Sequence, residues 1–143
     1  MAEFVPMSIA KAKEFLTSHH WGVLATRKKD GSAQMSPITP GLDSEGRVII
    51  SSRETAYKAK NLRRDPRASL CAFSESFHGG GWVQVNGTAV IVSLPEAMSS
   101  LIYLQRQVYG EHKDWSEFHH RMERERRLII RITIESAGPL VRG

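Results

Sequence analysis

Positively charged side chains gather in one short segment of the sequence, from Arg53 to Arg67. They are Arg53, Lys58, Lys60, Arg63, Arg64 and Arg67. Two hydroxyl side chains, Ser51 and Ser52, precede this segment, and Thr55 is placed to cap a helix within it. A helix N-terminus presents free N–H groups and a partial positive charge, which together stabilise a bound phosphate or carboxylate. The segment therefore predicts an anion-binding site.

The expected helix ends at Asp65-Pro66, because a proline does not continue a helix. Apolar residues at helical spacing form one stripe that can pack on a sheet: Ala56, Ala59 and Leu62. Lys58 and Asn61 are three residues apart and share a neighbouring face. The alternative interpretation is an ordinary solvated face, as in most basic helices. The apolar stripe favours the binding site, because a packed helix would hold Lys58 and Asn61 in register.

Motifs of the common catalytic centres are missing from the sequence. We recognise no serine-hydrolase elbow and no nucleophile with its base. The pairs His19-His20 and His119-His120 are poor chelators, since adjacent helical residues point about 100° apart, and no metal site is expected. The single cysteine, Cys71, lies in an apolar run and is interpreted as a buried thiol. A bound cofactor would then carry the chemistry, with a proton from solvent, Tyr57 or a histidine.

Length and composition describe an ordinary globular chain. Of its 143 residues, 41% are hydrophobic and 24% charged, which predicts one domain over residues 1–143. A deep cofactor site is hard to enclose in a domain of this size, so a dimer interface is a natural place for it. The net charge of +5 favours anionic partners, with nucleic acid the lesser alternative because no nucleic-acid-binding motif is present. Without a transmembrane-length apolar run or a secretory signal, we expect a cytoplasmic protein.

The order of the expected elements favours a mainly β fold with helices (α+β). The expected helices cover residues 9–18, the basic segment between Thr55 and Asp65, residues 95–108 and residues 115–126. The expected strands cover residues 21–26, 33–38, 48–52, 68–73, 82–92 and 128–134. Ser8 would cap the first helix, Ser93 or Pro95 would start the third, and Gly110 would stop it. Short turns between strands predict an antiparallel barrel or half-open sheet and argue against a doubly wound parallel sheet.

Three segments together carry a family resemblance. They are LATRKKDGSAQMSPI at 24–38, KAKNLRRDPR at 58–67 and GWVQVNGTA at 81–89. With this combination, the sequence resembles the pyridoxamine 5′-phosphate oxidase-like superfamily, and within it the coenzyme F420-dependent reductases. The resemblance extends from Trp21 to the last expected strand. It implies a split antiparallel β-barrel that forms a homodimer and binds FMN or the 5-deazaflavin F420 between its subunits.

The resemblance also implies which residues contact the cofactor. Its phosphate would be held by Ser51, Ser52, Arg53, Lys58 and Asn61. The polyglutamate tail of F420 would be within reach of Lys60 and Arg64. The deazaflavin ring would be lined by Gln34, Met35, Ser36 and Pro37. Trp82 would lie near the ring or the tail, or alternatively pack on the core at a strand end.

Three functions are compatible with these observations. The first, which we expect, is an F420H2-dependent oxidoreductase that transfers a hydride from the deazaflavin to an unsaturated or conjugated small molecule. The many cations suit the long anionic tail of F420. The second is an FMN-binding flavoprotein, for which fewer cations are needed. The third is a non-enzymatic carrier of a cofactor or a tetrapyrrole, which the fold would also permit.

Overall fold

The computed structural model describes residues 7–76 and 79–138 of the chain. Its helices are α1 (Ile9–Ser18), α2 (Tyr57–Arg64), α3 (Met98–Tyr109) and α4 (Trp115–Arg124). Its strands are β1 (Trp21–Arg27), β2 (Ala33–Ile38), β3 (Gly41–Leu42), β4 (Val48–Arg53), β5 (Arg67–Phe73), β6 (Trp82–Ser93) and β7 (Arg127–Gly138). Among the described residues, no helix is long and apolar enough to cross a membrane.

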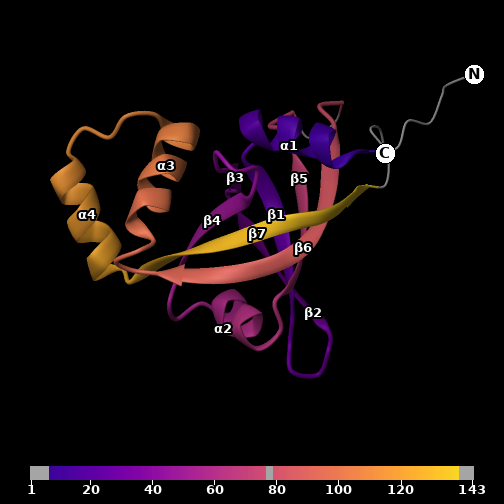
Figure 1. Ribbon diagram of the computed structural model, residues 1–143, viewed down its shortest axis with the longest axis horizontal. Coiled ribbons are helices and arrows are strands. Elements are labelled where there is room, and N and C mark those ends of the chain that lie inside the picture. Colours follow the sequence, from indigo (N-terminus) through magenta and orange to yellow (C-terminus); the bar gives the residue numbers. More distant parts are fainter. Residues whose placement is uncertain (1–6, 77–78, 139–143) are drawn as a thin grey trace, which may run out of the picture.

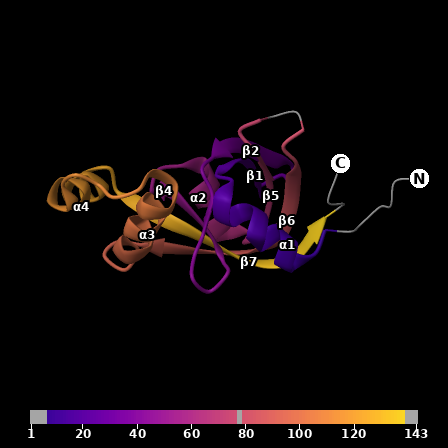
Figure 2. The same cartoon turned by 90° about the horizontal axis from the view of Figure 1, so that it is seen from above.

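The strands form one curled sheet in the order β2-β1-β5-β6-β7-β4-β3, and every neighbouring pair is antiparallel. The predicted antiparallel, mainly β architecture with helices is therefore confirmed. The helices α1 and α2 lie at opposite ends of the curled sheet, and α3 and α4 lie together beside it (Figure 1). Viewed from above, α4 lies at the far end of the molecule from α1 (Figure 2).

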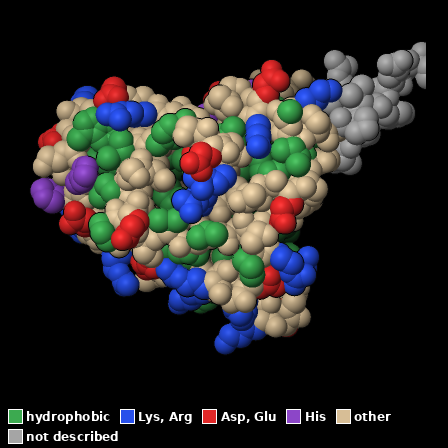
Figure 3. Space-filling view, in the orientation of Figure 1, with side chains coloured by type: hydrophobic (Ala, Val, Ile, Leu, Met, Phe, Trp, Pro, Cys, Tyr) green, Lys and Arg blue, Asp and Glu red, His purple; other side chains and the backbone are tan. Residues whose placement is uncertain are grey.

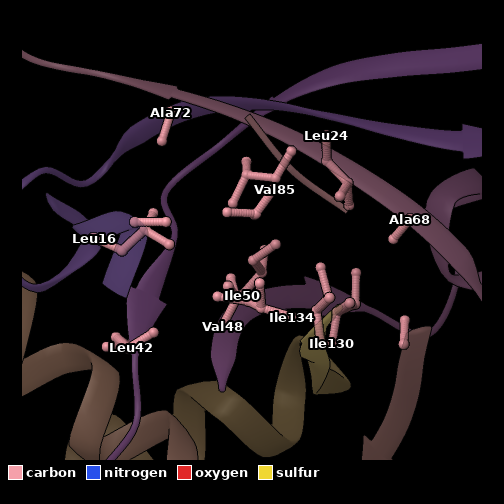
Figure 4. Packing of buried hydrophobic residues seen from close by; sticks show 14 of the residues in the cluster. Leu16, Leu24, Leu42, Val48, Ile50, Ala68, Ala72, Val85, Ile130 and Ile134 are labelled. Carbon is pink, nitrogen blue, oxygen red and sulfur yellow. The ribbon is translucent and has the colours of Figure 1, made fainter. Parts of the chain in front are cut away.

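The main core lies inside the curl of the sheet, where side chains from opposite strands meet (Figure 4). Residues on alternate positions of each strand point inward, as the period of a strand requires. Fully buried members include Leu24, Leu70, Val85 and Ile130. From α2, Ala59 and Leu62 join this core, which confirms the apolar stripe expected for the basic helix.

A second core lies on the outer side of β4 and β7, under α3 and α4. Ile49 and Ile129 supply the sheet side of it, and Leu101 and Phe118 supply the helix side. Because β4 alternates between the two cores, Ile49 and Ile50 are both fully buried although they point in opposite directions. The two helices are therefore fixed to the sheet by apolar packing.

The strands β6 and β7 bend together at a β-bulge between Asn86 and Gly87, where Glu135 has no partner in the register. At this bulge the backbones approach closely. A Cβ added to Gly87 would lie 1.9 Å from the Thr133 carbonyl oxygen, so only glycine fits. The bulge adds curvature to the long hairpin that carries α3 and α4.

Two predicted helix starts are wrong. Thr55 does not cap α2, because it lies in a turn in which the Ala56 N–H donates to the Arg53 carbonyl, and Ala56 takes the N-cap position without a side-chain hydrogen bond. The third helix starts at Met98 and not at Pro95, because the Met98 N–H first closes a tight turn onto the Pro95 carbonyl (3.1 Å). The caps at Ser8 and Gly110 are confirmed.

Candidate functional site

A groove of about 750 Å³ lies between the sheet and the α3–α4 pair. We call it the cationic groove. Its polar lining residues include Thr39, Ser51, Lys58, Gln105, His112, Arg121, Glu125 and Arg127. Apolar walls come from α3 and α4, including Leu101 and Phe118. On the face shown in Figure 3, Lys and Arg side chains gather along the lower side, where Figure 1 places α2.

Strand alternation decides which residues of β4 reach the cationic groove. Ser51 and Arg53 share the outer face with Ile49, whereas Ser52 points into the main core and is 4% exposed. The register places Ser51 opposite Ile129 and Arg53 opposite Arg127. Opposed residues of an antiparallel pair lie on the same face, so Arg127 is delivered to the cationic groove by the last strand.

One carboxylate balances two of the arginines near the cationic groove. Glu125 accepts hydrogen bonds from Nε of Arg127 (2.9 Å) and from Nη2 of Arg53 (3.3 Å). The hydrogen bond from Arg127 is the largest influence that lowers the pKa of the Glu125 carboxyl, and the charges of Arg127 and Arg53 add to it. Glu125 therefore stays ionised and holds Arg127 in place.

Two further cations of the cationic groove are not balanced. Among the described residues, neither Lys58 nor Arg121 has a carboxylate within ion-pair distance. Burial lowers the pKa of the Lys58 ammonium, and the positive charge of Arg127 lowers it further. The Nε atom of Arg121 is buried and makes no hydrogen bond to the described residues. Buried donors and like charges of this kind are stabilised by an anion.

The wall formed by α3 and α4 is held by a contact across their turn. Arg106 stacks over the ring of Trp115, with its guanidinium carbon 4.7 Å from the ring centroid. Glu111 accepts from both side chains, from Nε of Arg106 (2.6 Å) and from Nε1 of Trp115 (3.1 Å). His112 follows directly and packs between Trp115 and Phe118. These contacts between side chains of α3, α4 and the turn that joins them therefore fix this wall of the cationic groove.

A second pocket of about 590 Å³ adjoins the cationic groove, and the two share Tyr109 and the segment 37–39. We call it the aromatic pocket. Its lining includes Trp21, Phe73, Val108 and Tyr109. Trp21 and Tyr109 are 57% and 70% exposed, so their aromatic surfaces are available for contact. A charged groove and an aromatic pocket thus meet at the end of β2.

The structure brings three of the predicted site residues, Pro37, Ser51 and Lys58, to the cationic groove. Asn61 is placed differently, because its amide donates to the buried Thr26 hydroxyl (3.1 Å). The Thr26 hydroxyl donates in turn to Gln34 (3.3 Å). This chain of contacts ties α2 to β1 and β2, so Asn61 and Gln34 position the helix that carries Lys58.

The other predicted residues lie outside the cationic groove. Ser52 is in the core, and Arg53 is bound to Glu125. Arg64 donates to the Arg27 carbonyl (2.6 Å), and Lys60 lies over the Tyr57 ring on the surface. These residues, together with Met35, Ser36 and Trp82, line neither the cationic groove nor the aromatic pocket.

Trp82 lies far from the basic helix. It pairs with Phe73 at the end of β5 that is opposite to α2. At about 3.3 Å per residue, β5 separates the two positions by roughly 20 Å. Met35 is 67% exposed on the edge strand β2, and the Ser36 hydroxyl is buried without a described hydrogen-bond partner. The predicted cluster is thus divided between the ends of the sheet.

Sequence reasoning missed the residues that come from the C-terminal part of the chain. They are His112, Arg121, Glu125 and Arg127 in the cationic groove, and Tyr109 where it meets the aromatic pocket. The available signal was the charged run before the last strand, which includes Glu125 and Arg127. Within residues 7–76 and 79–138, no group of three or more acidic, histidine or cysteine side chains could hold a metal ion.

Several known proteins are similar to this chain. The conserved hypothetical protein Rv2991 from Mycobacterium tuberculosis has a TM-score of 0.77 at 27% identity, covering 96% of this chain and 86% of that one. An F420 reductase has a TM-score of 0.69 at 18% identity, covering 88% of this chain and 94% of that one. A protein from Listeria innocua that is named as a pyridoxamine 5′-phosphate oxidase has a TM-score of 0.67 at 15% identity, covering 94% of this chain and 98% of that one. The last two show a shared fold.

The predicted split-barrel fold is confirmed by these similarities, because the curled antiparallel sheet with its helices matches theirs over nearly its whole length. A family model described as pyridoxamine 5′-phosphate oxidase matches residues 9–139, from the first residue of α1 to just past β7. The chain therefore belongs to the pyridoxamine 5′-phosphate oxidase family.

Proposed function

We propose that this protein is an F420H2-dependent oxidoreductase that transfers a hydride to an unsaturated or conjugated small molecule. The observation that carries the proposal is the unbalanced positive charge of the cationic groove beside an aromatic pocket. Coenzyme F420 has the matching chemistry, with a planar ring, a phosphate and a carboxylate tail. When bound, it supplies the hydride, and the protein supplies binding, orientation and exclusion of water.

The residues of the cationic groove fit this group. Lys58, Ser51 and Arg127 would hold the phosphate, because a phosphate accepts charge-assisted hydrogen bonds and would relieve the repulsion between Lys58 and Arg127. Arg121 is the better candidate for a tail carboxylate than Lys60 or Arg64, since its buried Nε has no acceptor among the residues that the structure describes. Pro37, at the point where the groove and the pocket meet, would contact the ring.

The experiment that tests the proposal is a side-by-side titration of the purified protein with F420 and with FMN. F420 is expected to bind more tightly, because FMN offers a phosphate but no tail carboxylate for Arg121. Preference for FMN would move the protein to the flavoprotein alternative. Tight binding without turnover of any conjugated substrate would favour a carrier. Binding of neither would refute the proposal.

Lys58→Ala tests the position of the phosphate. We expect a loss of F420 affinity of about tenfold or more, or about 1.4 kcal/mol, because one charge-assisted contact is removed. Lys29→Ala is the matched control, since Lys29 is exposed in the β1–β2 turn, away from the cationic groove. Equal affinities of the two variants for F420, with both variants folded, would contradict the assignment of the phosphate to Lys58.

A further inference from the structure

We propose that the aromatic pocket binds an uncharged, conjugated substrate and that His20 delivers the proton to it from Nε2. The proposal rests on the proposed function, because it assigns the substrate and the proton source for the same hydride transfer. The residues concerned line the aromatic pocket, which shares the segment 37–39 with the cationic groove.

The orientation of the His20 ring is fixed by one hydrogen bond. Its Nδ1 lies 2.8 Å from the carbonyl oxygen of Pro40. A carbonyl only accepts, so Nδ1 carries the hydrogen, and in the neutral ring Nε2 has the free lone pair. Among the described residues, Nε2 has no hydrogen-bond partner, and His20 lines the aromatic pocket. An acid–base group needs this arrangement, in which one ring nitrogen fixes the orientation and the other can exchange a proton with a ligand.

The backbone holds this histidine at a defined place. His20 directly precedes β1, and Pro40 follows β2, whose end pairs with Gly22 through Ile38. The hydrogen bond from the His20 side chain to the Pro40 carbonyl therefore links β1 and β2 just beyond their last backbone pair. His19, the neighbouring residue, stacks instead on Phe15 of α1 (ring centroids 4.2 Å apart) and lies outside the pocket.

The lining of the aromatic pocket determines the class of substrate. Trp21, Phe73 and Tyr109 offer aromatic surface to a planar molecule. Among the described residues, His20 and Glu75 are the ionisable acidic and basic side chains of this lining, and the Glu75 carboxylate disfavours an anionic group. The cations lie in the cationic groove, so an uncharged conjugated molecule suits this pocket, and its volume is in the range of small-molecule sites.

The proposed step balances as an addition of two hydrogens across a carbon–carbon double bond conjugated to a carbonyl. The β-carbon accepts a hydride, for which the reduced deazaflavin is the donor. The electron pair of the double bond then resides on the α-carbon and the carbonyl oxygen. Protonated His20 gives the proton on Nε2 to the α-carbon, and the neutral imidazole remains with its hydrogen on Nδ1.

The first test uses protein without cofactor and methyl trans-cinnamate as the probe. In nitrogen-15 NMR spectra, neutral His20 should show the tautomer with hydrogen on Nδ1, and the ester should shift the signals of His20 and of the Trp21 indole. Trp21→Leu should weaken ester binding by about threefold to tenfold, as expected for an aromatic contact. Tyr103→Leu, at an exposed position of α3 that lines neither the aromatic pocket nor the cationic groove, should leave it unchanged.

The second test is His20→Asn, in which the amide can still donate to Pro40. With F420H2, we expect ester affinity within twofold of wild type, turnover reduced by about a hundredfold, and partial rescue of turnover by added imidazole. His19→Asn is the control and should behave as wild type. A hydrogen on Nε2, no shift at either residue, or full turnover of His20→Asn would each overturn the proposal. Failure to bind F420 would refute the cofactor only, since the first test decides the pocket independently.

Discussion

Lys58 is a residue of the cationic groove whose positive charge is disfavoured both by burial and by a neighbouring cation. Burial and the neighbouring charge of Arg127 both lower the pKa of its ammonium below the ordinary lysine value of 10.5. The folded protein therefore holds this proton less tightly than the unfolded chain does. The charged form is an unfavourable contribution to stability at neutral pH, and an anionic ligand would remove it.

Lys58→Met should therefore raise the melting temperature of the ligand-free protein at pH 7. As the pH rises through the lowered pKa of Lys58 toward 10.5, the wild-type lysine becomes neutral, and the difference between the two proteins should shrink. Thermal unfolding at several pH values measures this difference. A difference in melting temperature that stays constant with pH would show that the stabilisation by Lys58→Met comes from packing and not from the lost charge. Lys29→Met, at an exposed position, should show no gap at any pH.

The hairpin of β6 and β7 is the element that connects the two halves of the site. Its last strand pairs directly with β4 and places Arg127 opposite Arg53, and further along the hairpin a bulge at Gly87 adds curvature. The close approach of Gly87 to the Thr133 carbonyl leaves no room for a side chain. The curvature of the hairpin therefore depends on a contact between two backbones.

Gly87→Ala should destabilise the protein by about 1–3 kcal/mol, because the added methyl group forces the two backbones apart. Chemical denaturation measures the change. Gly138→Ala is the matched control in the same hairpin, since a Cβ at Gly138 meets no atom within 4 Å, and its effect should be within about 0.5 kcal/mol. Equal stability of the two variants would contradict the steric explanation.

Elements were predicted better than their relative positions. Hydrophobic alternation and turn residues located the long strands and α1, because these signals are local. The two-residue strand β3 had no such signal, and the start of α3 depended on a turn at Pro95. For the site, the basic segment pointed to Lys58, which the structure places in the cationic groove. Its partners Arg121 and Arg127 are more than sixty residues later, and only the folded register brings them together.

At the scale of the whole molecule, one face of the sheet is suited to contact with a second copy. Val23 and Cys71 lie opposite each other on the outer side of β1 and β5, as do Ala25 and Ser69. All four are half-buried, small and uncharged on a chain rich in lysine and arginine. The centres of protein interfaces are likewise depleted of charge. The proposed homodimer would use this face, and because Val23 also lines the aromatic pocket, the second copy would border that pocket.

Cys71→Arg tests that face. We expect the protein to change from a particle of twice its 16.1 kDa chain mass to a monomer, because an arginine without a partner would be buried between the copies. Light scattering after size-exclusion chromatography measures the mass. Ala10→Arg, on the exposed face of α1, should remain a dimer. Burial raises the pKa of the Cys71 thiol, so the wild-type residue stays protonated during the measurement. A dimeric Cys71→Arg variant would exclude this face.

The repulsion between Lys58 and Arg127 also has a consequence for the lifetime of the protein in a cell. A ligand present at a hundred times its dissociation constant stabilises a folded protein by about 2.7 kcal/mol, and the relief of the repulsion between Lys58 and Arg127 would be part of that binding free energy. Proteases act on the transiently opened chain, whose population depends on stability. Newly made chains would therefore be degraded faster when the anionic ligand is scarce. The amount of protein would follow the supply of this anionic ligand without any change in synthesis.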